Sequence, residues 1–581
     1  MSGVLSRLAG RLRTGDLVTG ISRLLALACL VGLVGMLPWL SGKDPALTIL
    51  RATSSDREPT PEVLASIRKS IGIDGGPLHV IGHWLAGVAR GDLGRSWVSG
   101  ADVGPDAVDA FGVSLSLMAA ALGVGVVVAA ALVLPALRDG LRGRPRPRGG
   151  AASAVLISLP EYLLAPILML VLAVYLRILP PFGWGSPEKV IMPALSLGLP
   201  TGGYLGGLVS DAVTATFSER WVATWSTAGI RGRPLAGAVL RRALAPLTGQ
   251  VALVVVALTG GAVAVEKIFA IPGLGRELLD AASAQDVPAL QAQILLLLAL
   301  ALTTGVIAGA VRRLLMGRAA GAGGLTAPPP VEHPGRAARV IAVSGAALLA
   351  LMVAVGIRRD PYAVVADKLA QPSAALPLGA DSLGRDVLAR VAHGAVSTVS
   401  GAVIVTVVCF VIAILVGLAP RAATGFIEVA NAAPPILAGL IVAGVSGPSA
   451  TGAAIAVAGV GWAPLASHAA GLVAENRQRP DVLLAPVLGE GRVRITLTRV
   501  LPAVVGPLAR HAALRLPGKA LALAALGFLG LGAQSPAPEW GLVLSDALPY
   551  IERAPWAVAT PAAALVVLSI TSVAASRSMR R

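Results

Sequence analysis

The sequence predicts an all-α polytopic membrane protein with about 12 transmembrane helices, divided into two six-helix halves. Three observations support this fold class. The 581 residues are 55% hydrophobic and only 14% charged, whereas a soluble chain carries about 25% charged residues. Apolar runs of about 20 residues, long enough to cross a bilayer core of roughly 30 Å, recur along the whole chain. A segment rich in Gly, Pro and Ala separates two sets of such runs.

The first half is expected over residues 1–317. The apolar run that follows Arg7, Arg11 and Arg13 has no small-residue cleavage site, so we interpret it as a retained first span. A polar segment at about 41–111 follows it. The expected spans are roughly 17–40, 112–137, 151–178, 190–212, 246–267 and 289–316.

The second half is expected over residues 338–581. It is preceded by a Gly/Pro-rich linker at 318–337, whose composition cannot bury an apolar face. The expected spans of this half are roughly 338–357, 396–418, 426–446, 450–473, 501–530 and 554–575.

The charge distribution predicts an orientation in the membrane. The net charge is +17, but the basic residues lie in short loops between apolar runs, so nucleic-acid binding is not expected. Arginines gather in the loop 138–148, in the loop 213–242 and on both sides of the linker, three regions that share one side if every span crosses once. The positive-inside rule makes that side cytoplasmic. We therefore expect a multi-pass protein of the cell membrane with a cytoplasmic N-terminus.

The chain lacks the sequence motifs of catalysis. It contains no G-x-x-x-x-G-K-[ST] phosphate cradle, no HExxH motif and no nucleophile elbow. The two cysteines, Cys29 and Cys409, lie inside apolar runs, so no metal site is expected from them. The sequence predicts a protein that is not an enzyme and holds no cofactor of its own.

Several stretches carry a family resemblance. The stretches 90–96 and 266–280 in the first half, and 377–401, 501–530 and 528–556 in the second half, occur in the order of two different subunits. They resemble the dipeptide/oligopeptide/nickel permeases of ABC importers. The resemblance implies two type I-like permease halves fused in one chain, which form a path for small peptides or metal chelates. It also implies separate ABC ATPase subunits, which bind the ATP, and an extracytoplasmic solute-binding protein as partners.

In the resembled family, the loop before the fifth span of each half carries a Glu-Ala-Ala motif followed three residues later by Gly. This motif forms a short coupling helix that docks on the ATPase. Both matched stretches keep the glycine, but an apolar residue replaces the glutamate. The candidate coupling residues are Ala223, Thr224, Trp225 and Gly229 in the first half, and Leu483, Leu484, Ala485 and Gly489 in the second.

A basic stripe interrupts the expected span at 501–530. His511, Arg515 and Lys519 are spaced four residues apart, so they share one face of a helix. Ionisable groups inside a span usually face a water-filled path. We interpret the stripe as a candidate part of the translocation path. The alternative is a span that starts near Ala520 and leaves the stripe solvated.

Two other functions remain open at this point. A secondary transporter with 12 spans in two halves would share the gross architecture. A fused permease with weakened ATPase coupling would explain the missing motif glutamate. The sequence does not identify the cargo.

Overall fold

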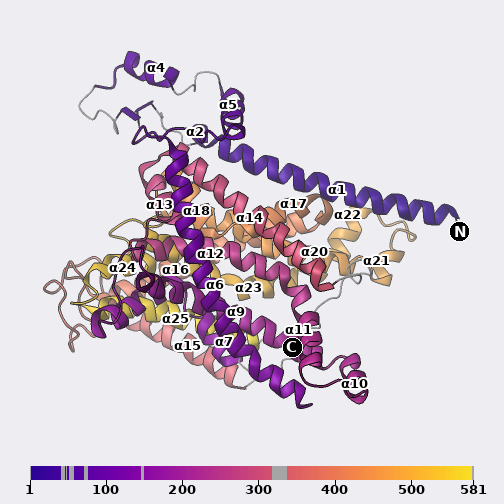
Figure 1. Cartoon of the computed structure of the whole chain (residues 1–581). Helices are drawn as coiled ribbons and strands as arrows, with labels where there is room; N and C mark the ends of the chain where they lie inside the picture. Colours follow the sequence, from indigo (N-terminus) through magenta and orange to yellow (C-terminus); the bar gives the residue numbers. More distant parts are fainter. Residues whose placement is uncertain are drawn as a thin grey trace. The chain divides into compact units, whose positions relative to one another are not determined.

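The structure is a computed structural model that describes residues 2–40, 46–47, 49–50, 58–70, 76–145, 150–316 and 336–578. The expected linker at 318–337 lies almost wholly outside these described residues. In the described part of the chain, the regular structure is helical (Figure 1). The first half contains α1 (Ser2–Gly35), α2 (Leu37–Leu40), α4 (Pro61–Ser70), α5 (Pro77–Ala89), α6 (Val103–Leu141), α7 (Gly150–Ile157), α8 (Glu161–Leu168), α9 (Pro187–Phe217), α10 (Arg220–Thr227), α11 (Arg233–Leu244), α12 (Thr248–Ile268), α13 (Leu274–Ala284) and α14 (Val287–Met316).

The second half is helical in the same way. It contains α15 (Arg336–Gly356), α16 (Val387–Gly417), α17 (Pro420–Ala432), α18 (Pro435–Ser446), α19 (Ala450–Gly461), α20 (Ala463–Asn476), α21 (Pro480–Leu484), α22 (Arg492–Ile495), α23 (Leu501–Leu529), α24 (Trp540–Ala547) and α25 (Pro555–Ser578). A π-helical turn at Thr496–Val500 joins α22 to α23.

Nine helices of the described residues are long and apolar enough to cross a membrane, and the bent pair α17–α18 would make a tenth. This confirms the all-α polytopic class. The difference from about 12 expected spans lies in three places. The segment 151–178 is split into α7, α8 and a π-helix, while α9 is 31 residues long but does not pass the same test. The span expected at 426–446 is the pair bent by 90°.

The chain forms two compact units, and each unit takes segments from both halves. Unit 1 comprises residues 1–104, 280–292 and 394–542. Within it, the N-terminal helix α1 packs along α17 of the second half. Ser22 Oγ donates to the carbonyl of Ala422 at 2.6 Å, and Arg23 pairs with Glu428 at 2.7 Å. The second-half core of this unit is therefore completed by the first span of the chain.

Unit 2 comprises residues 105–279, 293–393 and 543–581. Here α15 packs along α25, and α9 packs against α7, α8, α11 and α12. Glycines of α9 allow close approach to α6: a Cβ on Gly198 would lie 2.6 Å from the Ala121 carbonyl oxygen, and one on Gly202 would lie 2.7 Å from that of Gly125. Small residues spaced four apart, such as Gly198 and Gly202, allow the backbones of two membrane helices to approach closely.

Candidate functional sites

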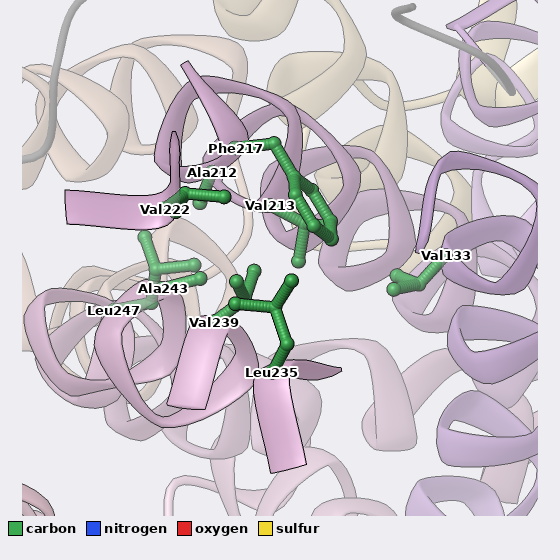
Figure 2. Packing of buried hydrophobic residues seen from close by; sticks show 9 residues of the cluster. All are labelled: Val133, Ala212, Val213, Phe217, Val222, Leu235, Val239, Ala243 and Leu247. Carbon is green, nitrogen blue, oxygen red and sulfur yellow. The ribbon is translucent and has the colours of Figure 1, made fainter. Parts of the chain in front are cut away.

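The first candidate coupling loop is an amphipathic helix seated on unit 2. Val222 of α10 is only 6% exposed and lies in an apolar cluster with Phe217 and Val239 (Figure 2). The residues that follow it, Ala223, Thr224 and Trp225, are exposed. The buried Val222 fixes the helix, and the next three side chains are exposed, so α10 presents a short exposed surface.

The second candidate coupling loop has the same plan in unit 1. Val482 of α21 is 7% exposed, while Leu483 and Leu484 are 61% and 58% exposed. Val487 and Leu488 are more exposed still, at 81% and 75%. Ala485 is buried, so it differs from the expected contact residues Leu483, Leu484 and Gly489, which are exposed. This loop therefore exposes more apolar surface than a loop facing only water would be expected to carry.

Both loops end at a glycine in the left-handed conformation. Gly229 has φ 84° and Gly489 has φ 82°. Apart from its two chain neighbours, a Cβ added at either position would have no atom of the described residues within 4 Å. The requirement for glycine within the chain is therefore the backbone angle, which costs other residues about 1–2 kcal/mol.

The two loops differ in how they are braced. In α10, the rings of Trp221 and Trp225 pack edge to face with centroids 5.3 Å apart. The second loop has a shorter helix, and Pro486 follows its end by two residues, where its missing N–H does not break a helical hydrogen bond. Arg499, which follows the second loop in the sequence, forms an ion pair with Glu490 of that loop. The hydrogen bond from Arg499 lowers the pKa of the Glu490 carboxyl.

The basic stripe lies on α23 within unit 1. The helix is continuous from Leu501 to Leu529 and is preceded by further helical turns from Arg492, so the stripe and the apolar residues after Ala520 belong to one helix. Arg515 Nε donates to His511 Nε2 at 3.1 Å. His468 of α20 stacks on His511 with ring centroids 4.2 Å apart. The structure thus adds His468, a residue from a different helix, to the stripe.

Lys519 is the buried end of this stripe, at 6% exposed. It lies beside Cys409 of α16, since a Cβ built on Gly461 would be 3.3 Å from both Cys409 Sγ and Lys519 Cε. Arg515 is exposed, and His511 is half-buried. The stripe therefore runs from an exposed guanidinium to a buried ammonium along one helix face.

Sequence reasoning recognised the stretch 377–401 but assigned no role to its charges. In unit 2, Asp381 Oδ2 accepts from both Arg385 and Arg390 at 2.7 Å, and Arg390 also lies 3.5 Å from Asp546. A small pocket is lined by Asp381, Arg390 and Asp546, with Ser382 among the other residues around it. A charged cluster could have been predicted from the closely spaced opposite charges of Asp381, Arg385, Asp386 and Arg390. The participation of Asp546 could not, because it lies far away in the sequence.

These features define a class: a helical membrane permease with two related halves, each presenting one anchored loop. Residues 150–320 and 410–579 match the family described as binding-protein-dependent transport system inner membrane component. The two matches together cover more than half of the chain, so the chain belongs to this family. It is a fused dual permease of an ABC importer, which removes the alternative of a secondary transporter.

Similar proteins come from several importers. The glutathione transport system permease protein GsiC of Salmonella choleraesuis is 32% identical over 303 residues, 50% of this chain and 90% of that protein. The peptide transport system permease protein SapC of Escherichia coli O6:H1 is 35% identical over 202 residues, 33% of this chain and 67% of that protein. The metal-staphylopine import system permease protein CntB of Staphylococcus aureus is 28% identical over 281 residues, 48% of this chain and 89% of that protein.

Proposed function

We propose that the two anchored loops dock ATPase subunits, which bind and hydrolyse the ATP that drives transport, while this chain itself catalyses no reaction. One observation carries the proposal: each loop has one buried valine, outward-facing side chains and a terminal left-handed glycine, although the loops lie in different units. A shared plan on two loops of different sequence is explained by one kind of partner that binds twice.

The chemistry of the contact differs from that of a carboxylate-based motif. No acidic side chain stands at Ala223 or Leu483, so we infer that the second contact depends on apolar packing by Leu483 and Leu484. Arg492 and Arg494 are exposed at the start of α22 and supply positive charge close by in the chain. Burying two exposed leucines in a partner contributes about 1.5–3 kcal/mol for each side chain.

We propose small peptides or metal chelates as the cargo, delivered by an extracytoplasmic solute-binding protein. The printed names of the relatives span peptides, glutathione and metal-staphylopine, which supports this range. His511, Arg515 and Lys519, with His468 beside them, would favour cargo with anionic groups, because cationic donors form the stronger hydrogen bonds to carboxylates.

We propose that the N-terminus and the linker are cytoplasmic, as the arginine distribution predicts. Reporter fusions at Pro330 test this orientation. A reporter that works only in the cytoplasm should be active there, and activity of a periplasm-dependent reporter at the same position would contradict the orientation.

Co-purification tests the docking proposal. The full chain should bind candidate ATPase subunits and stimulate their ATP hydrolysis. The double variant Leu483→Asp/Leu484→Asp should lose binding, because each substitution places a charge in an apolar contact. Val365→Asp is the matched control, since Val365 is also exposed, at 55%, but lies between α15 and α16.

Two results would count against the proposal. Equal binding by the leucine double variant and the wild type would remove the second loop from the interface. Binding without stimulated hydrolysis would favour the remaining alternative, a fused permease with weakened coupling.

A further inference from the structure

A buried carboxyl group ties three elements together in the first half. Glu266, near the end of α12, is 0% exposed. Its Oε1 accepts from Ser114 Oγ of α6 at 2.6 Å, and its Oε2 accepts from the Arg276 N–H of α13 at 3.0 Å. Ser114 Oγ in turn accepts from the Leu274 N–H at 2.8 Å. We call this arrangement the first carboxyl clamp, and it lies wholly within unit 2.

The second half has the same arrangement, wholly within unit 1. Glu539, 7% exposed, lies directly before α24. Its Oε1 accepts from Thr398 Oγ1 of α16 at 3.2 Å and from the Gly541 N–H at 2.9 Å, and its Oε2 accepts from the Leu542 N–H at 2.9 Å. The Trp540 N–H lies 3.5 Å from Thr398 Oγ1. We call this the second carboxyl clamp.

The two clamps align residue by residue. Leu274 and Trp540 are each the first residue of their short helix, and each N–H points to the hydroxyl of the neighbouring long helix. Arg276 and Leu542 are the third residues, and each donates its N–H to the carboxyl.

A second set of contacts fixes the same register. A Cβ on Gly275 would meet the Val263 Cα at 2.8 Å, and one on Gly541 would meet the Ala524 backbone. Val263 lies three residues before Glu266, which carries the carboxyl of the first clamp. Ala524 likewise lies three residues before Gly527, which faces the carboxyl of the second clamp.

In this register the glutamate and the glycine exchange places. In the first half, α12 supplies Glu266 and the loop supplies Gly273, whose added Cβ would overlap the Glu266 carboxyl. In the second half, the loop supplies Glu539 and α23 supplies Gly527, whose added Cβ would overlap Glu539 Oε2. The carboxyl occupies one place in both halves, although it arrives from opposite sides.

A simple helix cap does not account for this exchange. A carboxylate before a short helix does stabilise it, but removing a carboxylate from water is expensive, and apolar packing in the same space would often be as stable. Both halves nevertheless keep the acceptor, on different residues. In each half the chain also leaves its unit shortly afterwards, after Leu279 and after Leu542.

We propose that Glu266 and Glu539 are positioning residues of the transport cycle. Each fixes the start of its short helix, α13 or α24, to the second and fifth long helices of its half, so that these three elements move as one body. What transport requires is a carboxyl at that place, whichever residue carries it. The proposal depends on the permease function of the chain and is independent of the docking loops.

The exchange itself provides the test. Glu266→Gly and Gly273→Glu should each lower uptake at least about tenfold, because the first removes the acceptor and the second places two carboxyls in one buried space. The double variant Glu266→Gly/Gly273→Glu copies the second half and should return uptake to within about threefold of the wild type. Glu539→Gly, Gly527→Glu and their double variant repeat this cycle in the other half.

Uptake is measured with labelled trialanine, glutathione and nickel–histidine, using the probe for which deletion of the chain gives a defect. Hydrogen exchange of the Arg276 and Leu542 amides in the purified full chain provides a readout without cargo. Each single variant should speed exchange of the amide in its own half, and each double variant should restore its protection.

Glu266→Gln and Glu539→Gln cover the case in which the exchanged chains fail to insert. Glutamine keeps the volume. Both carboxyl oxygens of Glu539 accept from backbone N–H groups, so a glutamine there turns one donor toward another donor. In the first clamp the Ser114 hydroxyl can turn to accept from a glutamine, so Glu266→Gln should have the milder effect. We expect normal insertion of both variants, with uptake reduced about tenfold in Glu539→Gln. Wild-type uptake by Glu539→Gln would overturn the proposal, as would double variants that insert normally but transport no better than the singles.

Discussion

The helices α12 and α23 are the fifth long helices of their halves. The contacts at their C-terminal ends correspond, but the residues along the rest of each helix differ. In the register of the carboxyl clamps, His511, Arg515 and Lys519 of α23 correspond to Gln250, Val254 and Leu258 of α12. The fold therefore constrains where these helices end, while their bodies are free to differ. In the proposed roles of the basic stripe and the carboxyl clamps, one half selects the cargo, whereas both halves carry the geometry that moves it.

The largest expected effect is at the coupling glycines, where the halves should behave alike. Gly489→Trp should abolish uptake with normal insertion, because φ is 82° and a tryptophan would also cover the docking surface. Gly491→Trp is the matched control: Gly491 lies two residues away with equally open surroundings but has φ −70°. Uptake assays on both chains, and on Gly229→Trp, measure the difference.

The result is informative in either direction. Loss in Gly229→Trp and Gly489→Trp, with uptake retained in Gly491→Trp, means that both halves couple through the left-handed turn. Wild-type uptake by both coupling variants would count heavily against docking at these loops.

The second prediction concerns the body of α23. Arg515→Ala/Lys519→Ala should reduce uptake of anionic cargo at least about tenfold relative to neutral cargo, since the loss of even one charge-assisted hydrogen bond costs about 1.5–3 kcal/mol. Gln250→Ala in α12 is the matched change in the other half and should leave the ratio unchanged. Equal uptake of both kinds of cargo by the double variant, at wild-type rates, would remove the stripe from the path.

The third prediction uses the second carboxyl clamp. Burial raises the pKa of Glu539 from its ordinary 4.5 to about 7, against the effect of its hydrogen bonds. The folded chain therefore binds more protons than the unfolded chain between these values, and stability falls as pH rises. The stabilising contribution of the protonated form is complete below about pH 4.5 and is lost by about pH 7.

The measurement is the Tm of the wild type and of Glu539→Gln in detergent. The Tm of the wild type, relative to that of the variant, should fall by a few degrees between about pH 5 and about pH 8. A difference that stays constant over this range would show that Glu539 does not titrate there.

The smallest effect is expected where the halves meet in unit 1. Arg23 and Glu428 are 58% and 48% exposed, so their ion pair should contribute at most about 1 kcal/mol. A double-mutant cycle on Tm with Arg23→Ala and Glu428→Ala measures it.

Ser22→Ala should lower the Tm more than the loss of this ion pair. Ser22 is buried, accepts from the Gly425 N–H and donates to the Ala422 carbonyl.

Much of this molecule could be predicted from its sequence. Apolar runs gave the membrane class, and the matched stretches gave two halves and the two loops that end in Gly229 and Gly489. These features are local, because a run or a turn is written in consecutive residues. The 90° bend between α17 and α18 falls at Pro434-Pro435, a helix-breaking pair that the expectation of one straight span at 426–446 did not take into account.

The candidate sites were predicted less completely, for a related reason. His468 joins the basic stripe from a different helix, and Asp546 reaches Arg390 from more than 150 residues away in the sequence. The exchange of glutamate and glycine is harder still to predict, because each half alone shows an unremarkable pair. The exchange can be recognised only when the two halves are aligned in three dimensions, with Leu274 matched to Trp540.

The division of the chain into interleaved units has a consequence for its synthesis. Unit 1 includes residues as late as 542 and unit 2 includes α25, so neither unit is complete until segments far along the chain from its first residues have left the ribosome. In particular, α15 packs against α25 and must wait for it. Two separate subunits would have to meet by diffusion, whereas here the covalent linkage holds the partners at high effective concentration. A prematurely terminated chain should therefore leave unfinished surfaces in both units, where quality-control proteases can recognise them.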